Sequence, residues 1–206
     1  MPESFIQVPP DSTGKKTRTR SRTIGANDVH EQGVFTAALP TYWVLADAVA
    51  FATNKHHLSI LNAAGSGKVV ALKKLFQINL QLAGITGVAL RFDFKRITAH
   101  ATGTLLTPES CDSTDAALPA QITCRTNSGS ATEGAILWPY GCQNDEVSAG
   151  NTAVANYLSQ GLNWLPEGVE MQEYRLREGE GITMKQITAS SVGTFGWLLC
   201  FTVDDA

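Results

Sequence analysis

Charge is scarce in this sequence. Asp, Glu, Lys and Arg make up 17% of the 206 residues, whereas about a quarter is usual in soluble proteins. Two explanations stay open: much of the surface contacts other protein, or a β-rich fold covers its faces with Thr and Ser. The net charge of −3 gives no support for a chain-wide nucleic-acid surface, and we expect no nucleic-acid partner.

Long apolar runs are absent as well. No run approaches the 18 or so residues that a membrane-spanning helix needs. The opening MPESFIQVPPDSTGKK lacks the basic region and following apolar region of a secretory signal. We therefore expect no membrane partner, and a protein that stays in a cytoplasm-like compartment until another component moves it.

Cysteine and histidine are too few and too scattered for a recognisable metal site. The cysteines form no CxxC pair and have no histidine at zinc-finger spacing, which favours buried, reduced thiols at all four positions: Cys111, Cys124, Cys142 and Cys200. His56 and His57 start a predicted strand, so their rings are expected to point to opposite faces. A partly exposed structural pair is the default interpretation, and we expect neither a metal nor a cofactor.

The run Gly65-Ser66-Gly67-Lys68 suggests a phosphate-binding loop at first sight. Such a loop needs Gly, four residues, and then Gly-Lys followed by Ser or Thr, but Asn62 and Val69 stand at the first-glycine and hydroxyl positions. Apart from Lys74, apolar residues then follow at a period of two, as in a strand: Val70, Leu72, Phe76, Ile78 and Leu80. The sequence predicts the turn of a β-hairpin, with Lys68 as the first residue of the second strand.

Other catalytic patterns are missing too. There is no G-x-S-x-G elbow, and no cysteine lies in a nucleophile signature. The densest acidic group surrounds strand and turn candidates and has no marker of a cleft: Glu167, Glu170, Glu173, Glu178 and Glu180. A solvated set at a strand edge is favoured over the carboxylate pair of a glycoside hydrolase, and we expect no enzyme.

Residues 1–34 are predicted to form an extended, basic N-terminal arm. Val8-Pro9-Pro10 favours an extended backbone, and no apolar period follows. Five of the 16 basic residues of the chain lie within eight positions: Lys15, Lys16, Arg18, Arg20 and Arg22. In an extended strand the three arginines share one face. This strip could lie along an acidic protein groove, pair with a neighbour's sheet edge or touch nucleic acid; the alternative is a flexible, solvated tail.

From position 35 to 206 the dominant period is two, which predicts one β-domain. In the closing segment Phe195, Trp197 and Leu199 share a face with Phe201 and Val203. Further strands are expected at residues 42–51, 57–63, 68–80, 88–95, 103–107, 121–126, 134–138, 171–177 and 181–187, and only residues 148–161 suggest a short helix. Many short strands without βαβ alternation indicate an all-β sandwich or barrel.

Aromatic residues raise one alternative. Trp138-Pro139-Tyr140, with Trp43 and Trp164, is a candidate sugar platform. Trp and Tyr are also common in sandwich cores and enriched at protein interfaces. Core or subunit contact is therefore favoured, with Trp138 and Tyr140 as candidate interface residues.

The segment FIQVPPDSTGKKTRTRSRTIGANDVHEQGVF, residues 5–35, resembles the opening of small structural proteins in virions of tailed bacteriophages. LNAAGSGKVVALKKLFQINLQ, GVALRFDFKRITA and GEGITMKQITASSVGTFGWLLCFTV look similar too, so the resemblance covers much of the chain, without a sharp functional motif. Such proteins commonly form oligomeric β-sandwiches, often jelly rolls. The resemblance therefore implies a virion protein assembled in the host cytoplasm, with a jelly-roll-like antiparallel β-sandwich at residues 35–206.

The function that this resemblance implies is capsid decoration or cementing, with a homotrimer as the expected oligomer. The basic residues of the arm would pair with acidic residues of the major capsid protein or of other virion subunits. A neck, tail or head-fibre component is a second hypothesis. A carbohydrate-binding receptor module that uses the Trp138 loop is a third, from a different class.

Overall fold

The computed structural model contains two units that divide after Ala38. It describes the backbone of residues 3–7, 16–24 and 27–32 in the first unit, and residues 39–79, 88–144, 160–163, 173–189 and 193–205 in the second.

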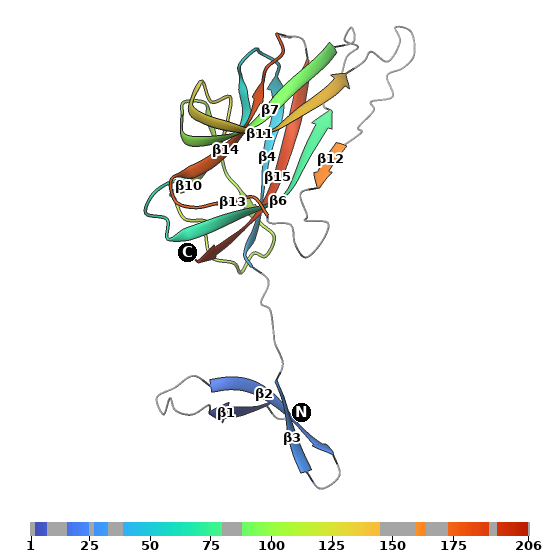
Figure 1. Ribbon diagram of the computed structural model, residues 1–206, viewed down its shortest axis with the longest axis vertical. Helices are drawn as coiled ribbons and strands as arrows, with labels where there is room; N and C mark the ends of the chain where they lie inside the picture. The colour runs from blue at the N-terminus through green and yellow to red at the C-terminus, as the bar shows by residue number, and fades with distance from the viewer. Residues whose placement is uncertain are drawn as a thin grey trace. The chain divides into compact units, whose positions relative to one another are not determined.

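The first unit is a three-stranded antiparallel sheet in the order β1-β2-β3 (Figure 1). Its strands are β1 (Glu3–Gln7), β2 (Lys16–Ile24) and β3 (Asn27–Gln32). The extended backbone predicted for this region is therefore organised as strands that pair with one another. The Thr and Ser residues that alternate with arginine in β2 suit a strand, because β-branched and small polar side chains fit a pleated surface.

The second unit consists of two antiparallel sheets packed face to face, which confirms the predicted β-sandwich (Figure 1). The first sheet has the order β11-β7-β14-β5-β10-β8, with these bounds: β5 His56–Asn62, β7 Val88–Ala101, β8 Thr104–Leu106, β10 Ile122–Thr126, β11 Ser130–Asn144 and β14 Glu180–Gln186. The second has the order β12-β6-β15-β4-β9, with β13 beside β6: β4 Thr41–Ala50, β6 Lys68–Asn79, β9 Glu109–Ser110, β12 Gln160–Asn163, β13 Arg175–Leu176 and β15 Thr194–Asp205.

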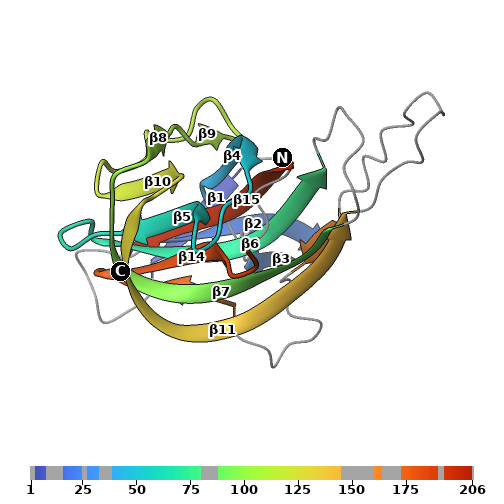
Figure 2. The same ribbon diagram turned by 90° about the horizontal axis from the view of Figure 1, so that it is seen from above.

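The strand connections have jelly-roll topology. β7 pairs with β11, β6 with β12, β5 with β14 and β4 with β15. These pairs are nested in the sequence, and successive pairs alternate between the two sheets, which is the arrangement of a jelly roll. The strands β8, β9 and β10 are inserted between β7 and β11, and Figure 2 shows them on the side of the sandwich opposite β11.

This topology corrects the prediction for the Gly65–Gly67 turn. β5 and β6 lie in different sheets, so the turn carries the chain across the sandwich and does not close a β-hairpin. Lys68 begins β6 as predicted.

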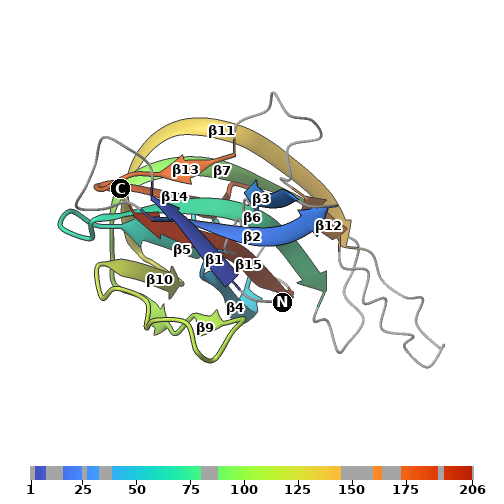
Figure 3. The same ribbon diagram turned by 90° about the horizontal axis from the view of Figure 1, so that it is seen from below.

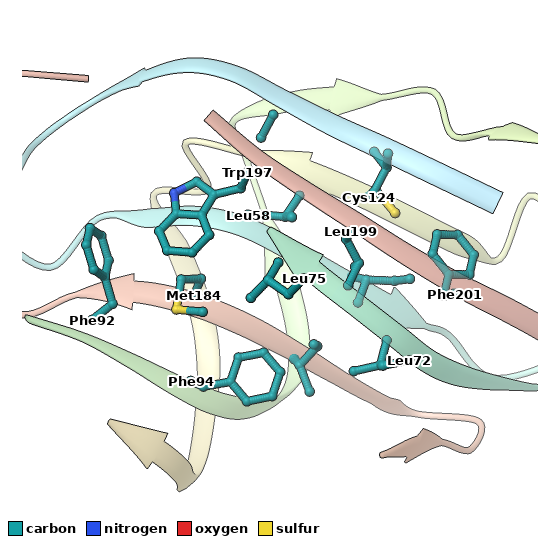
Figure 4. Packing of buried hydrophobic residues seen from close by; sticks show 14 of the residues in the cluster. Leu58, Leu72, Leu75, Phe92, Phe94, Cys124, Met184, Trp197, Leu199 and Phe201 are labelled. Carbon is teal, nitrogen blue, oxygen red and sulfur yellow. The ribbon is translucent and has the colours of Figure 1, made fainter. Parts of the chain in front are cut away.

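The core lies between the sheets and centres on β15. Its five predicted inward residues are all buried: Phe195, Trp197, Leu199, Phe201 and Val203. They meet a row from the first sheet that includes Phe92, Phe94 and Met184 (Figure 4). The rings of Trp197 and Phe92 have centroids 5.1 Å apart in an edge-to-face arrangement. Burial of each such side chain stabilises the fold by about 1.5–3 kcal/mol.

A β-bulge in β6 changes which of its side chains point into the core. Cys200 of β15 stands opposite Lys74, and the next residue, Phe201, stands opposite Leu72. Lys73 is therefore an extra residue in the ladder. One extra residue reverses the faces of all residues that follow it.

Because of this reversal, two residues predicted to face outward point into the core, and two residues predicted to face the core point outward. Leu75 and Gln77 are buried, whereas Phe76 and Ile78 are half-buried on the outer face of the second sheet. The uninterrupted period of two that the sequence predicts for Phe76 and Ile78 is therefore wrong.

The predicted helix at residues 148–161 falls almost entirely outside the described residues, and its last two residues belong to β12. In the part of the chain that the structure describes, no helix has the length and hydropathy of a membrane span.

Candidate functional surfaces

The amides of the glycine-rich turn bind a carboxylate of the protein itself. Gly65 and Gly67 have positive φ angles of 84° and 64°, which glycine adopts without steric cost. The amide of Gly67 donates to Oε1 of Glu178 at 2.6 Å. This bond and one from the Gly65 amide lower the pKa of Glu178. The geometry that suggested a phosphate site thus holds Glu178, a residue that sequence spacing does not connect with this turn.

The described members of the acidic group have partners within the fold. Glu173 forms an ion pair with Lys73. Glu180 lies 3.6 Å from Arg96 and accepts a hydrogen bond from the amide of Arg177. Glu167 and Glu170 lie outside the described residues. The three described carboxylates therefore serve the protein's own contacts and form no catalytic pair.

Tyr140, a candidate interface residue, belongs to the core. Its residue surface is 9% exposed, and its hydroxyl donates to Oε1 of Gln77 at 2.6 Å. Burial raises the pKa of Tyr140 to about 12. Trp138 is half-buried, with its ring 6.4 Å from Phe94 and 6.5 Å from Tyr140. A buried Tyr140 offers no platform for a sugar, while Trp164 lies outside the described residues.

The predicted histidine pair has rings in different surroundings, but the expected partial exposure is wrong. Both residues are buried. His57 contacts the core rings of Phe92 and Trp197. His56 instead bonds through Nδ1 to the Thr183 hydroxyl at 3.0 Å, and its Nε2 lies 3.4 Å from Glu133. Burial lowers the pKa of both rings, that of His57 to about 4.

A Ser–His contact near the first sheet resembles a nucleophile and its base. Oγ of Ser59 lies 2.8 Å from Nδ1 of His100. However, Ser59 is buried, and the second ring nitrogen of His100 contacts the hydroxyl of Thr123 at 2.8 Å. Burial lowers the pKa of His100 to about 4, and Arg125 adds to this effect. The contact therefore ties β5, β7 and β10 together and leaves the serine without access to a substrate.

The outer face of the first sheet carries an ion-pair network centred on Glu133. Its carboxylate accepts hydrogen bonds from Lys95 and from Lys185, the latter at 2.6 Å. Burial opposes the charged form of Glu133, but the two lysines outweigh this and lower its pKa to about 2. Both lysines of this network have Glu133 as their ion-pair partner, so the network carries one net positive charge.

The outer face of the second sheet carries a cluster of apolar side chains, with Lys74 in the same row as Trp43. Five side chains form what we call the apolar face: Trp43 and Leu45 on β4, Phe76 and Ile78 on β6, and Leu198 on β15. Leu198 stands opposite Leu45 on one side and Phe76 on the other. The rings of Trp43 and Phe76 are stacked, with centroids 6.1 Å apart.

Exposure makes the apolar face a candidate contact surface. Leu45 is 45% exposed, and the other four residues are half-buried. Contiguous apolar patches on a protein surface often mark interaction sites. The sequence alone does not reveal this surface, because the bulge in β6 places Phe76 and Ile78 on it.

A groove of about 470 Å³ lies at the end of the sandwich where β8 and β9 form the sheet edges. Figure 3 shows β9 and β10 together at this side of the fold. Its lining includes Leu105, Leu118 and Ile122, and two carboxylate residues, Glu109 and Asp115. The hydroxyl of Tyr42 donates to the carbonyl of Ala116 at 2.7 Å and fixes one wall. The sequence did not predict this groove, because its walls meet only in the folded chain.

The basic residues of the first unit lie mainly on its central strand. Lys16, Arg18 and Arg22 belong to β2, and Lys15 lies outside the described residues. Arg20 also lies on β2, where it stands opposite Glu3 of β1 and Glu31 of β3. The three arginines occupy alternate positions of β2.

The four cysteines are free thiols that differ in exposure. Cys124 and Cys200 are buried as predicted, Cys142 is half-buried and Cys111 is exposed, so the prediction is wrong for Cys111. Burial raises the pKa of Cys200 to about 11. Among the residues with described positions, no three His, Cys, Asp or Glu side chains gather as a metal site would require.

No family model matches this chain, and neither the curated proteins nor the solved structures contain a match.

Proposed function

We propose that this protein is a structural subunit of a bacteriophage virion, and specifically a decoration protein of the head shell. The observation that carries this proposal is a jelly-roll body with an exposed apolar face, preceded by a separate basic unit. Jelly rolls are a recurrent architecture of capsid proteins. The titratable groups that suggested catalysis are used within the fold, which also favours a structural role.

The two surfaces have different tasks in this proposal. The apolar face joins copies of the body around a symmetry axis, because burying Trp43, Leu45 and Phe76 removes apolar area from water. The oligomer of this proposal is a homotrimer. The basic residues of the first unit, Lys15 to Arg22, attach the oligomer to acidic groups of the major capsid protein. Both contacts would form during assembly in the host cytoplasm.

The number of copies per purified virion tests this proposal. We expect hundreds of copies, as a protein that covers the head shell requires. About a dozen copies or fewer would instead assign the protein to the neck, tail or head fibres. Absence from the virion would overturn the proposal.

A substitution experiment tests the role of the basic unit. The triple variant Arg18→Gln, Arg20→Gln and Arg22→Gln should bind capsids stripped of the protein at least tenfold more weakly, because each lost charge pair weakens the contact. Arg177→Gln, at an exposed position on the body, is the control and should bind normally. Equal occupancy by the triple variant would contradict the anchoring role.

A further inference from the structure

The groove at the end of the sandwich has an open strand edge beside it. β8 is the last strand of the first sheet and pairs with β10 alone, and β9 is the last strand of the second sheet. One edge of β8 therefore has no strand partner in the described part of the chain. An edge of this kind can pair with an added extended segment.

The lining of the groove is mostly apolar, and its charged residues are all acidic. Leu105 is 58% exposed at the rim, and the residues around it include Pro108, Leu118 and Pro119. The charged residues of the lining are Glu109 and Asp115, and neither has an ion pair with any described residue. No lysine, arginine or histidine belongs to the lining.

We propose that this groove binds an extended peptide segment of another protein, in which basic side chains alternate with apolar ones. The open edge of β8 provides backbone hydrogen bonds, the apolar lining residues contact the apolar side chains of the segment, and Glu109 and Asp115 pair with its basic side chains. A volume of about 470 Å³ falls within the range of ordinary ligand sites. The alternation follows from the strand itself, because neighbouring side chains point to opposite faces.

This inference goes beyond the proposed function and does not depend on it. Neither the basic unit nor the apolar face contributes to the groove lining, so the site would serve any protein that carries a suitable segment. The experiment uses the purified full-length chain and synthetic peptides. Its result is therefore separate from whether the protein occurs in virions.

The test is fluorescence anisotropy with labelled octapeptides of alternating Arg and Val, or alternating Glu and Val. We expect the Arg peptide to bind and the Glu peptide to bind at least tenfold more weakly. Raising NaCl from 50 to 500 mM should weaken binding of the Arg peptide several-fold, because ions screen its charge pairs. No binding of the Arg peptide at 1 mM, or equal binding of the two peptides, would overturn the proposal.

Variants then locate the site. Glu109→Gln combined with Asp115→Asn should weaken binding of the Arg peptide about tenfold, and Leu105→Asn should weaken it several-fold. Asp47→Asn removes an exposed charge from β4 outside the groove and should leave affinity unchanged. Two further Arg peptides are N-methylated at the Arg residues or at the Val residues, and the one whose methylated amides face β8 should lose affinity, because it cannot complete the hydrogen bonds to that strand. Unchanged binding of the double variant, or of both N-methylated peptides, would contradict the inference.

Discussion

Trp197 and His57 form a hydrogen bond in the core that depends on the protonation of the imidazole. The indole Nε1 of Trp197 donates to Nδ1 of His57 at 3.3 Å, and Nε2 of His57 lies 3.0 Å from Oε1 of Gln186. An acceptor at Nδ1 and a donor at Nε2 define the neutral ring with its proton on Nε2. A second proton at Nδ1 would face the indole N–H, so the core accommodates the neutral form.

The fold should lose stability as the pH falls from about 6.5 to 4. Burial lowers the pKa of His57 from 6.5 to about 4, so in this interval the unfolded chain binds a proton that the folded chain does not. Protonation then favours unfolding, and His57 alone accounts for on the order of 2 kcal/mol between pH 7 and 4.5. The lowered pKa of His100 acts in the same direction. Urea unfolding at pH 7.0, 5.5 and 4.5 measures the effect.

The variant His57→Gln separates this contribution from the others. It should be less stable than the natural protein at pH 7, because the buried contacts change. Its stability should also vary less between pH 7.0 and 4.5, since the titrating group is gone. Glu133, with a pKa of about 2, loses its contribution only below about pH 4.5 and does not mask the result. An equal pH dependence in the two proteins would contradict the role assigned to His57.

Gly181 on β14 should be intolerant of any side chain. A Cβ atom there would lie 2.5 Å from the carbonyl oxygen of Ile60 and 2.9 Å from Cγ1 of Ile97. Because one of these contacts is with backbone of the neighbouring strand, relief requires the sheet to shift. Overpacking of this kind typically costs about 1–3 kcal/mol. We therefore expect Gly181→Ala to lower the free energy of unfolding by an amount in this range or above it.

Gly141→Ala is the matched control, on β11 of the same sheet. A Cβ at Gly141 would have the carbonyl oxygen of Leu90 as its nearest neighbour, at 4.0 Å. That is an ordinary van der Waals distance, so stability should change by no more than about 0.5 kcal/mol. Chemical denaturation of the two variants provides the comparison. Equal losses in both would show that the close contacts at Gly181 are not the cause.

The sequence predicts the all-β fold well, because period-two alternation is a local signal. β15 illustrates this, since its alternating apolar residues are buried as expected. In β6, by contrast, the alternation of apolar residues does not predict which side chains are buried. In the run KKLFQINL both alternating sets contain apolar residues, so the sequence does not reveal that a bulge at Lys73 places Leu75 inside and Phe76 outside.

Long-range contacts are the second reason why candidate sites escape sequence analysis. The carboxylate that binds the Gly67 amide comes from Glu178, 111 positions away. The groove likewise joins Tyr42 of β4 to residues of the β8–β10 insertion. Neither association leaves a spacing pattern, because the nested pairing of the jelly roll brings distant segments together.

The Glu178 contact should keep the Gly65–Gly67 turn ordered. Replacing Glu178 with Gln removes the negative charge that the two amides surround, and charge-assisted hydrogen bonds are stronger than neutral ones. Amide hydrogen exchange at Gly65 and Gly67 should therefore accelerate several-fold in Glu178→Gln. Asp47→Asn makes the same charge change beside the Ala46–Trp197 pair, whereas the turn adjoins the Lys68–Asp205 pair at the other end of β15, so it should leave these rates unchanged. Unaltered exchange in Glu178→Gln would show that the carboxylate does not order the turn.

The apolar face should control self-association. Leu45 is the most exposed residue of that face and stands beside Leu198, and a lysine there would place a charge in the contact between copies. We expect Leu45→Lys to weaken association at least tenfold. A tenfold change corresponds to the loss of an interface contact worth roughly 1.4 kcal/mol. Sedimentation velocity at micromolar concentrations should show the natural protein as an oligomer, with the trimer as the expected species, and the variant mainly as monomer.

Leu105→Lys is the control for that experiment, because Leu105 is even more exposed than Leu45 but lies at the groove. It adds the same charge in place of the same apolar residue and should leave the oligomer intact. If both variants dissociate to the same extent, the effect comes from added charge in general and not from the apolar face. A natural protein that stays monomeric at 100 µM would contradict the proposed self-association itself, and the apolar face would then need a different partner.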